Sequence, residues 1–177
     1  MLTLAETVRA VDQFLQSEPA STALTFRTPV QFDSTLIRRL IDAHGALNAH
    51  FASLVCRLGD EPESAISAIR ECARRLHELR RTEALWLYPV IARGVENDAA
   101  ARRELVQLRL VMLTLVRRVL RRFDELLQAV TQGVPTVPLA EQVSAALAEY
   151  VRRNEAEIYP LYDIVSLRNS HRAYASA

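Results

Sequence analysis

Apolar residues recur at intervals of three and four positions along most of this chain. Such spacing places them on one side of an α-helix. Four long stripes of this kind cover residues 37–58, 66–90, 105–130 and 143–165. No segment shows the strict alternation of a half-buried β-strand. The pattern therefore predicts an all-α fold built from four long amphipathic helices.

Capping and turn residues separate the four stripes. Asp33 or Ser34 is placed to cap the first long helix, and Pro62 suits the first turn of the second. Asn97 or Asp98 is placed to cap the third helix. Because the connections between the stripes are short, we expect an up-down-up-down four-helix bundle.

The ends of the chain differ from this central part. Residues 1–32 carry a short amphipathic stripe followed by turn formers, which predicts a small N-terminal helix and a crossing loop packed on the bundle. The bundle itself is expected to cover residues 33–167. Residues 168–177 are expected to form a flexible tail.

Two polar residues fall within the apolar stripes. Glu83 shares the second stripe with Leu79 and Trp86, and His44 lies in the middle of the first stripe. A carboxylate inside an apolar bundle is costly unless it is paired, protonated or bound to a metal. Since both residues lie about halfway along their helices, we expect them to meet at a similar height.

The region around Glu83 has a fainter copy later in the chain. Residues 76–89 and 150–160 are both helical runs that end in Tyr-Pro, with an acidic residue about two turns before the proline. Pro89 is expected to break or kink its helix.

These residues carry a resemblance to a known family. With His44 in the first helix, Glu83 ahead of Tyr88-Pro89, and a repeat ending in Tyr159-Pro160, residues 34–165 resemble the hemerythrin-like (HHE cation-binding) family. The resemblance implies a four-helix bundle whose helices supply His and Glu ligands to a di-iron centre. It also implies iron or oxygen chemistry as the family's activity.

The chain departs from the family pattern at several ligand positions. Leu79 stands where the first motif has a histidine, and Tyr150 and Asn154 stand where the fourth helix has its histidine and glutamate. The third stripe contains no histidine. We therefore predict that the di-iron site is largely lost and that no cofactor is bound, with iron binding around His44 and Glu83 as the alternative.

Several residues of the predicted site have more than one interpretation. His77 and Glu155 are further metal-ligand candidates, but each lies on a different helix face from the stripe. His44 is either a metal ligand or a core histidine hydrogen-bonded to Glu83, Asn154 or Tyr150, the last two forming a predicted polar core cluster. The alternative for Glu83 is that it faces a seam between helices and pairs with Arg80 or Arg153.

Composition and charge limit the classes of partner. The 177 residues include 22 basic and 21 acidic side chains, so the net charge of +1 gives no general attraction to nucleic acid. The chain has no run of eighteen apolar residues, and its first residues lack the pattern of a secretory signal. We expect no membrane span and a cytoplasmic location.

The third helix carries two surfaces suited to contacts. One is a basic face formed by Arg117, Arg118, Arg121 and Arg122, which is either a solvated surface or a docking site for an acidic partner, with nucleic acid the weaker choice. The other is a broad apolar face suited to homodimer formation.

Three functions follow from these observations. The favoured one is a non-enzymatic, hemerythrin-like bundle with a regulatory or scaffold role exerted through protein contacts. The alternative is an iron-binding or oxygen- and redox-sensing protein with a reduced site at His44 and Glu83. The second alternative is an anti-sigma-type regulator, because the helix order is loosely similar to that of the bacterial Rsd/AlgQ-type bundles.

Overall fold

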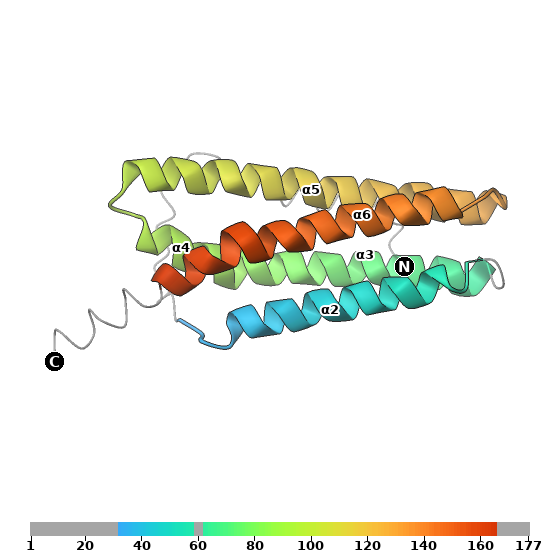
Figure 1. The fold of residues 1–177 in the computed structure, drawn as a ribbon, viewed down its shortest axis with the longest axis horizontal. Helices are drawn as coiled ribbons and strands as arrows, with labels where there is room; N and C mark the ends of the chain where they lie inside the picture. Colours follow the sequence, from blue (N-terminus) through green and yellow to red (C-terminus); the bar gives the residue numbers. More distant parts are fainter. Residues whose placement is uncertain (1–31, 59–61, 166–177) are drawn as a thin grey trace.

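Four long helices lie side by side along the long axis of the molecule (Figure 1). The computed structural model describes residues 32–58 and 62–165. The long helices are α2 (Leu36–Val55), α3 (Pro62–Thr82), α5 (Ala99–Gln132) and α6 (Val137–Arg153). No strand occurs within these described ranges. The predicted all-α class is therefore confirmed.

The helices form a closed ring of contacts. Helix α2 packs against α3 and α6, and α5 packs against the same two helices. Each long helix therefore has two neighbours and directs one apolar side toward a shared interior. The arrangement is a helical bundle, as the spacing of apolar residues predicts.

The third long helix begins and ends at residues with clear capping roles. Asp98 accepts hydrogen bonds from the backbone N–H groups of Ala100 and Ala101, at 2.9 and 3.0 Å. Of the two predicted caps for this helix, Asp98 is therefore the N-cap. Gly133 closes α5 with φ of 67°, a left-handed conformation that glycine adopts without steric cost.

The first described helix begins slightly later than its predicted caps. Helix α2 starts at Leu36, and its N-cap residue Thr35 makes no side-chain capping bond. Asp33 instead accepts hydrogen bonds from the backbone N–H and the hydroxyl of Thr35, at 2.8 and 2.7 Å. Asp33 thus stabilises the turn before the helix, and the prediction of Asp33 or Ser34 as the cap was wrong by one or two residues.

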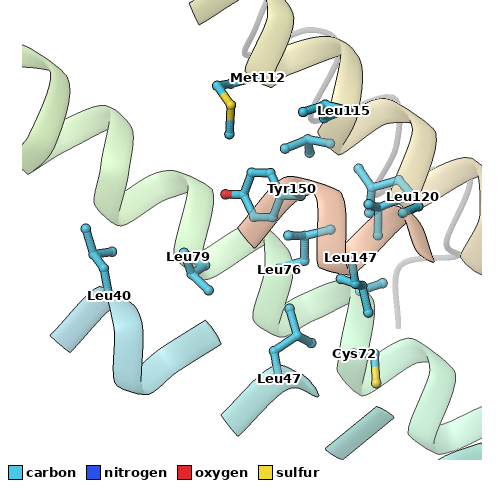
Figure 2. Close-up of a cluster of buried hydrophobic side chains, with 14 of the residues drawn as sticks. Leu40, Leu47, Cys72, Leu76, Leu79, Met112, Leu115, Leu120, Leu147 and Tyr150 are labelled. Carbon is cyan, nitrogen blue, oxygen red and sulfur yellow. The ribbon is translucent and has the colours of Figure 1, made fainter. Parts of the chain in front are cut away.

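The core draws on all four long helices. Figure 2 shows Tyr150 of α6 close to Met112 of α5 and to Leu76 and Leu79 of α3. All four of these side chains are at most 4% exposed. Burial of large apolar side chains contributes about 1.5–3 kcal/mol each, so this interior is the main source of stability.

Two helices continue past a widened turn. Helix α3 passes through the π-helical segment η1 (Glu83–Leu87) into α4 (Tyr88–Gly94), and α6 passes through η2 (Asn154–Ile158). The described chain then remains helical to residue 165. The two prolines of the repeat therefore widen their helices without breaking them.

The widened turns have a local cause. Proline has no N–H, and its ring clashes with the carbonyl four residues earlier. In each segment the residue before the proline bonds across five residues: Tyr88 N–H donates to the carbonyl of Glu83, and Tyr159 N–H donates to the carbonyl of Asn154. This longer step makes room for Pro89 and Pro160.

The widened turn also changes which side chains face solvent. The apolar spacing predicts that Trp86 lies in the core stripe, but Trp86 is 57% exposed and its neighbour Leu85 is 52% exposed. One extra residue in the turn shifts the register of everything inside it. Of the two predicted places for Trp86, the core and the rim of the bundle, the core is therefore wrong.

Some predictions fall outside the described residues. The N-terminal helix and crossing loop, residues 1–31, and the tail beyond residue 165 are among them. Within the described ranges, no helix is both long enough and apolar enough to span a bilayer. The up-down-up-down order stays a prediction.

Candidate functional site

Glu83 is the centre of a buried polar cluster at the start of η1. Its side chain is 0% exposed, as the apolar stripe predicts. The hydroxyl of Tyr150 donates to Oε1 over 2.8 Å, and Nη1 of Arg80 donates to Oε2 over 2.5 Å. Each carboxylate oxygen therefore has a strong donor, one from α6 and one from the preceding turn of α3.

His44 faces this carboxylate from helix α2. Its imidazole is 1% exposed, and Nδ1 lies 3.1 Å from the hydroxyl of Tyr159. Nε2 lies 3.9 Å from Oε1 of Glu83, which is too long for a direct hydrogen bond. His44 and Glu83 thus meet in the core as predicted, without bonding directly.

Aromatic rings enclose the imidazole. The ring of Tyr150 meets His44 edge to face at 5.3 Å between centroids, and the ring of Tyr159 stacks on it at 6.2 Å. Both phenols are nearly fully buried. The predicted hydrogen-bond partner of His44 was Glu83, Asn154 or Tyr150, so its observed partner Tyr159 corrects that prediction.

Asn154 occupies the position in η2 that Glu83 occupies in η1. It is 0% exposed, and its amide nitrogen donates to the carbonyl of Tyr150 over 3.3 Å. Its Oδ1 is buried and has no hydrogen-bond partner among the described residues. The predicted polar core cluster of Tyr150 and Asn154 is therefore present in the interior, with Asn154 bonded to its own helix.

Burial sets the protonation states in the cluster. It lowers the pKa of His44 to about 4, so this imidazole is neutral at pH 7. Burial raises the pKa of Glu83, while Arg80 and the hydrogen bond from Tyr150 act in the opposite direction. Burial also raises the pKa of Tyr150 well above its usual value and that of Tyr88 to about 12, so both phenols stay protonated.

The apolar spacing does not predict that Arg80 belongs to the buried cluster. Its side chain is only 12% exposed, and its guanidinium lies 5.7 Å from the centroid of the Tyr88 ring. The guanidinium of Arg109 on α5 lies 5.0 Å from the same ring. Of the two arginines considered as partners for Glu83, Arg80 makes the contact, while Arg153 bonds to Glu149 and Glu157.

The remaining metal-ligand candidates lie away from the centre of the cluster. Glu155 is exposed and His77 is half-buried at the surface of α3. Leu79, one turn before Glu83, is an apolar core residue. Among the described residues, no group of three or more His, Cys, Asp and Glu side chains is close enough to hold a metal ion.

The cluster does not fit a di-iron centre. Such a centre needs several inward ligands from all four helices, whereas in the described part of the chain only His44 and Glu83 are buried residues of the ligand type. Both oxygens of Glu83 already accept hydrogen bonds, one of them from a cation. The arrangement can orient hydrogen bonds and fix helix register.

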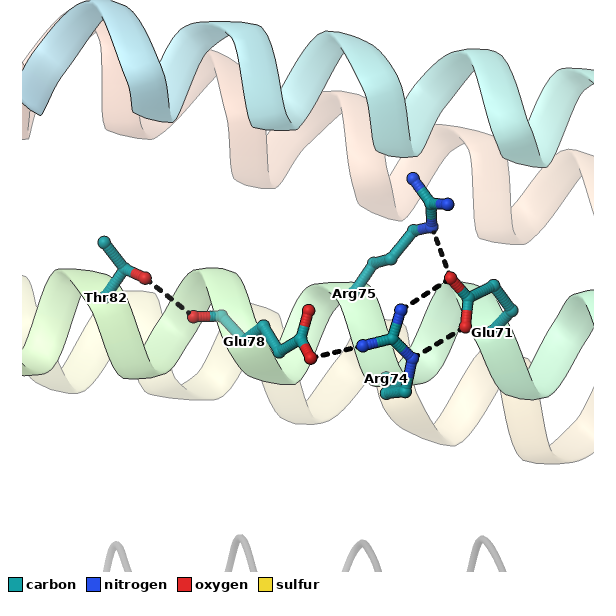
Figure 3. A network of polar contacts seen from close by, with 5 residues as sticks. All are labelled: Glu71, Arg74, Arg75, Glu78 and Thr82. Carbon is teal, nitrogen blue, oxygen red and sulfur yellow. Dashed lines mark hydrogen bonds and ion pairs between the residues drawn. The ribbon is translucent and has the colours of Figure 1, made fainter.

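Charged surface residues pair mainly within their own helices. On α3, Glu71 bonds to Arg74 and Arg75, Arg74 also bonds to Glu78, and the hydroxyl of Thr82 donates to the carbonyl of Glu78 (Figure 3). The hydrogen bonds from Arg74 hold the pKa of Glu71 at about 2. Exposed pairs of this kind contribute little to stability, so the network is a solvated face.

Part of the basic face of α5 also pairs with an acidic residue of its own helix. Arg117, Arg118 and Arg121 are exposed, and Arg122 is half-buried. Nη1 of Arg122 donates to Glu125 over 2.5 Å, and Arg121 lies 3.9 Å from the same carboxylate. A neighbouring acid therefore offsets part of this charge.

The fold and the cluster together define a helical bundle with a closed, buried polar centre. In comparisons with protein-family models, curated proteins and solved structures, nothing matches this chain.

Proposed function

We propose that the protein is a hemerythrin-like four-helix bundle that has lost its di-iron chemistry and acts through contacts with other proteins, as a regulator or scaffold. The repeated Tyr-Pro segments and the burial of His44 beside Glu83 support the hemerythrin-like part. The colour order in Figure 1 reverses direction from each long helix to the next, which supports an up-down-up-down arrangement.

One observation carries the contact role. In the two widened turns, Leu85 and Trp86 of η1 correspond to Ala156 and Glu157 of η2. With the same backbone geometry, η2 thus has a small residue and a charged residue at these positions, whereas η1 has two exposed large apolar side chains. Exposed tryptophan is typical of contact surfaces between proteins, where it supplies much of the binding energy.

The surroundings of Trp86 suit a docked side chain or helix. Trp86 lines a hollow of about 610 Å³ together with Phe32, Arg39 and Thr82. Phe32 is itself 38% exposed. Asp33 also lines the hollow and pairs with Arg39, so the hollow combines two aromatic walls with an ion-paired edge, a composition that favours an amphipathic partner.

Helix α5 offers a second apolar surface, suited to a second copy of the chain. Val106, Leu110 and Val111 are 49%, 52% and 40% exposed. The deeper residues of the same broad face, Val116 and Leu120, are buried in the bundle. A homodimer would therefore use the N-terminal half of α5.

Site-specific photo-crosslinking tests the contact role. A photoreactive amino acid is placed at position 86 in one variant and at the matched position 157 in the other, and each is expressed in the cells that make the protein. We expect discrete crosslinked products, self or foreign, from position 86 only. Equal products from both positions, or none from either, would contradict the proposal.

Self-association is measured separately, by sedimentation. Trp86 is the only tryptophan in the chain, so its emission reports whether the surface around η1 is covered in the same complex. Sedimentation and tryptophan emission are measured over a wide range of protein concentration, with Leu110→Glu as the comparison variant. If the chain dimerises through α5, Leu110→Glu remains monomeric at concentrations where the natural chain is a dimer. A monomer at every concentration leaves only a foreign partner.

A reduced metal site remains the second candidate function. The specific observation in its favour is Nε2 of His44, a buried atom that has no hydrogen-bond partner among the described residues and lies 3.9 Å from a carboxylate oxygen. Metal analysis of the purified protein and of His44→Ala tests it. Stoichiometric iron that is lost in the variant would favour an iron-binding or redox-sensing role.

A further inference from the structure

The buried carboxylate of Glu83 has a fixed cation beside it. Arg80 lies one turn earlier on the same helix, and Nη1 is 2.5 Å from Oε2 of Glu83. The arginine side chain is 12% exposed, and the glutamate side chain is 0% exposed. The two groups therefore form an ion pair that is almost entirely removed from water.

Arginine differs from other bases in this setting. A guanidinium does not lose its proton in proteins, so a buried arginine needs an anion close by. Glu83 is the carboxylate that Arg80 contacts within the described residues, and the Tyr88 ring covers part of the guanidinium. Each of the two charges thus depends on the other for its place in the core.

The second oxygen of Glu83 is also engaged. Oε1 accepts a hydrogen bond from the hydroxyl of Tyr150 across the bundle, at 2.8 Å. A metal ion bound to this carboxylate would have to displace one of the two donors. It would also sit within a few ångströms of the Arg80 charge, where repulsion in a dry interior is strong.

We propose that the guanidinium of Arg80 takes the place of a metal cation as the partner of Glu83, and that its charge keeps divalent metal ions out of the cluster. The inference rests on the hemerythrin-like part of the proposed function, which supplies the expectation of a metal here. It is independent of any protein partner.

The exclusion of metal ions by Arg80 is tested by placing a histidine next to Glu83, once with Arg80 present and once without it. Leu79→His returns a histidine one turn before Glu83, and it is compared with the double variant Leu79→His/Arg80→Met. Cobalt(II) binding is measured by calorimetry and by the visible absorption spectrum. We expect about tenfold or more tighter binding in the double variant than in Leu79→His. Equal binding by the two would overturn the proposal.

A neighbouring arginine provides the matched control. Arg81 follows Arg80 on the chain but is exposed. Leu79→His/Arg81→Met removes the same charge at the surface, so we expect it to bind cobalt no more tightly than Leu79→His alone. Tighter binding in this control would show that net charge, and not the place of Arg80, governs metal affinity.

A double-mutant cycle tests the pairing even if Arg80→Met alone fails to fold. Arg80→Met and Glu83→Gln each leave one buried charge unpaired, so we expect each to shift the unfolding equilibrium by more than about a hundredfold. Arg80→Met/Glu83→Gln removes both charges and should fold with a much smaller loss. A double variant that does not fold, or effects that simply multiply, would overturn the pairing. Loss of the crosslinks at position 86 would leave this result unchanged, so the two proposals fail separately.

Discussion

The imidazole of His44 and the hydroxyl of Tyr159 form a contact of 3.1 Å between residues 115 positions apart. It joins the middle of α2 to the first residue after the widened turn η2. Because Nε2 of His44 has no partner among the described residues, Nδ1 makes the only hydrogen bond of this buried ring. The contact therefore fixes how the first and last described helices meet.

Removing the hydroxyl of Tyr159 tests how much this contact contributes to the free energy of unfolding. Tyr159→Phe leaves His44 with two unbonded ring nitrogens in the core, so we expect a loss of about 1–3 kcal/mol in the free energy of unfolding. Denaturant titration of the variant measures it.

Tyr88→Phe is the matched control for that measurement. The hydroxyl of Tyr88 is buried and has no hydrogen-bond partner among the described residues. We therefore expect this variant to match or slightly exceed the stability of the natural chain. A similar loss in both variants would assign the effect to packing and not to the hydrogen bond.

The low pKa of His44 makes stability depend on pH. The folded imidazole has a pKa of about 4, against 6.5 for an unperturbed one, because burial disfavours its charged form. Between these values the unfolded chain binds a proton that the folded chain does not, so stability falls as the pH is lowered. We expect a loss of about 3 kcal/mol between pH 7 and pH 4 from this residue.

The variant His44→Gln isolates that contribution. Glu83 has a raised pKa, so it acts in the opposite direction as the pH falls and offsets part of the loss. Denaturant titrations at pH 7, 5.5 and 4.5 should show a shallower decline for His44→Gln than for the natural chain. Parallel declines would mean that His44 does not resist protonation in the folded state.

Periodicity was sufficient to predict the all-α fold and the depth of Glu83 and His44, since both depend on the repeat of an α-helix. It failed at Trp86 because a widened turn adds a residue to that repeat. The Tyr-Pro pairs mark both widened turns in the sequence, and the proline's missing N–H is the physical signal. The Tyr159-Pro160 pair is visible in the sequence, but the contact of Tyr159 with His44 depends on how the first and last described helices pack.

The partner of Glu83 was harder to predict. Arg80 and Arg153 are both close to acidic positions on their helices, and the choice depends on which side chain the bundle covers. Helical spacing shows that Arg80 is one turn from Glu83, but a surface arginine at that spacing is common. The Tyr88 ring over its guanidinium and the ion pair with Glu83 accompany the burial of Arg80, which is only 12% exposed.

The N-cap of α5 offers a test of two neighbouring polar residues. Asp98 accepts two backbone N–H groups, and Asn97 makes no capping bond to this helix. Asp98→Ala should lower the free energy of unfolding by about 1 kcal/mol, whereas Asn97→Ala should leave it nearly unchanged. Thermal unfolding of the two variants measures the difference, and equal effects would contradict the assignment.

Two helical glycines differ in the space around them, so substitution by alanine should change the stability in opposite directions at the two positions. A Cβ at Gly94 would lie 2.3 Å from Cγ1 and 2.8 Å from Cβ of Val165, while a Cβ at Gly45 would meet no atom within 4 Å. Val165 is β-branched and cannot easily turn aside. Gly94→Ala should therefore destabilise the fold by about 1–3 kcal/mol through overpacking. Gly45→Ala should stabilise it by about 0.5–1 kcal/mol, because alanine loses less backbone entropy in a helix. Denaturant titration of both variants decides the matter, and a stable Gly94→Ala protein would show that α4 and the last described helical turn do not pack this closely.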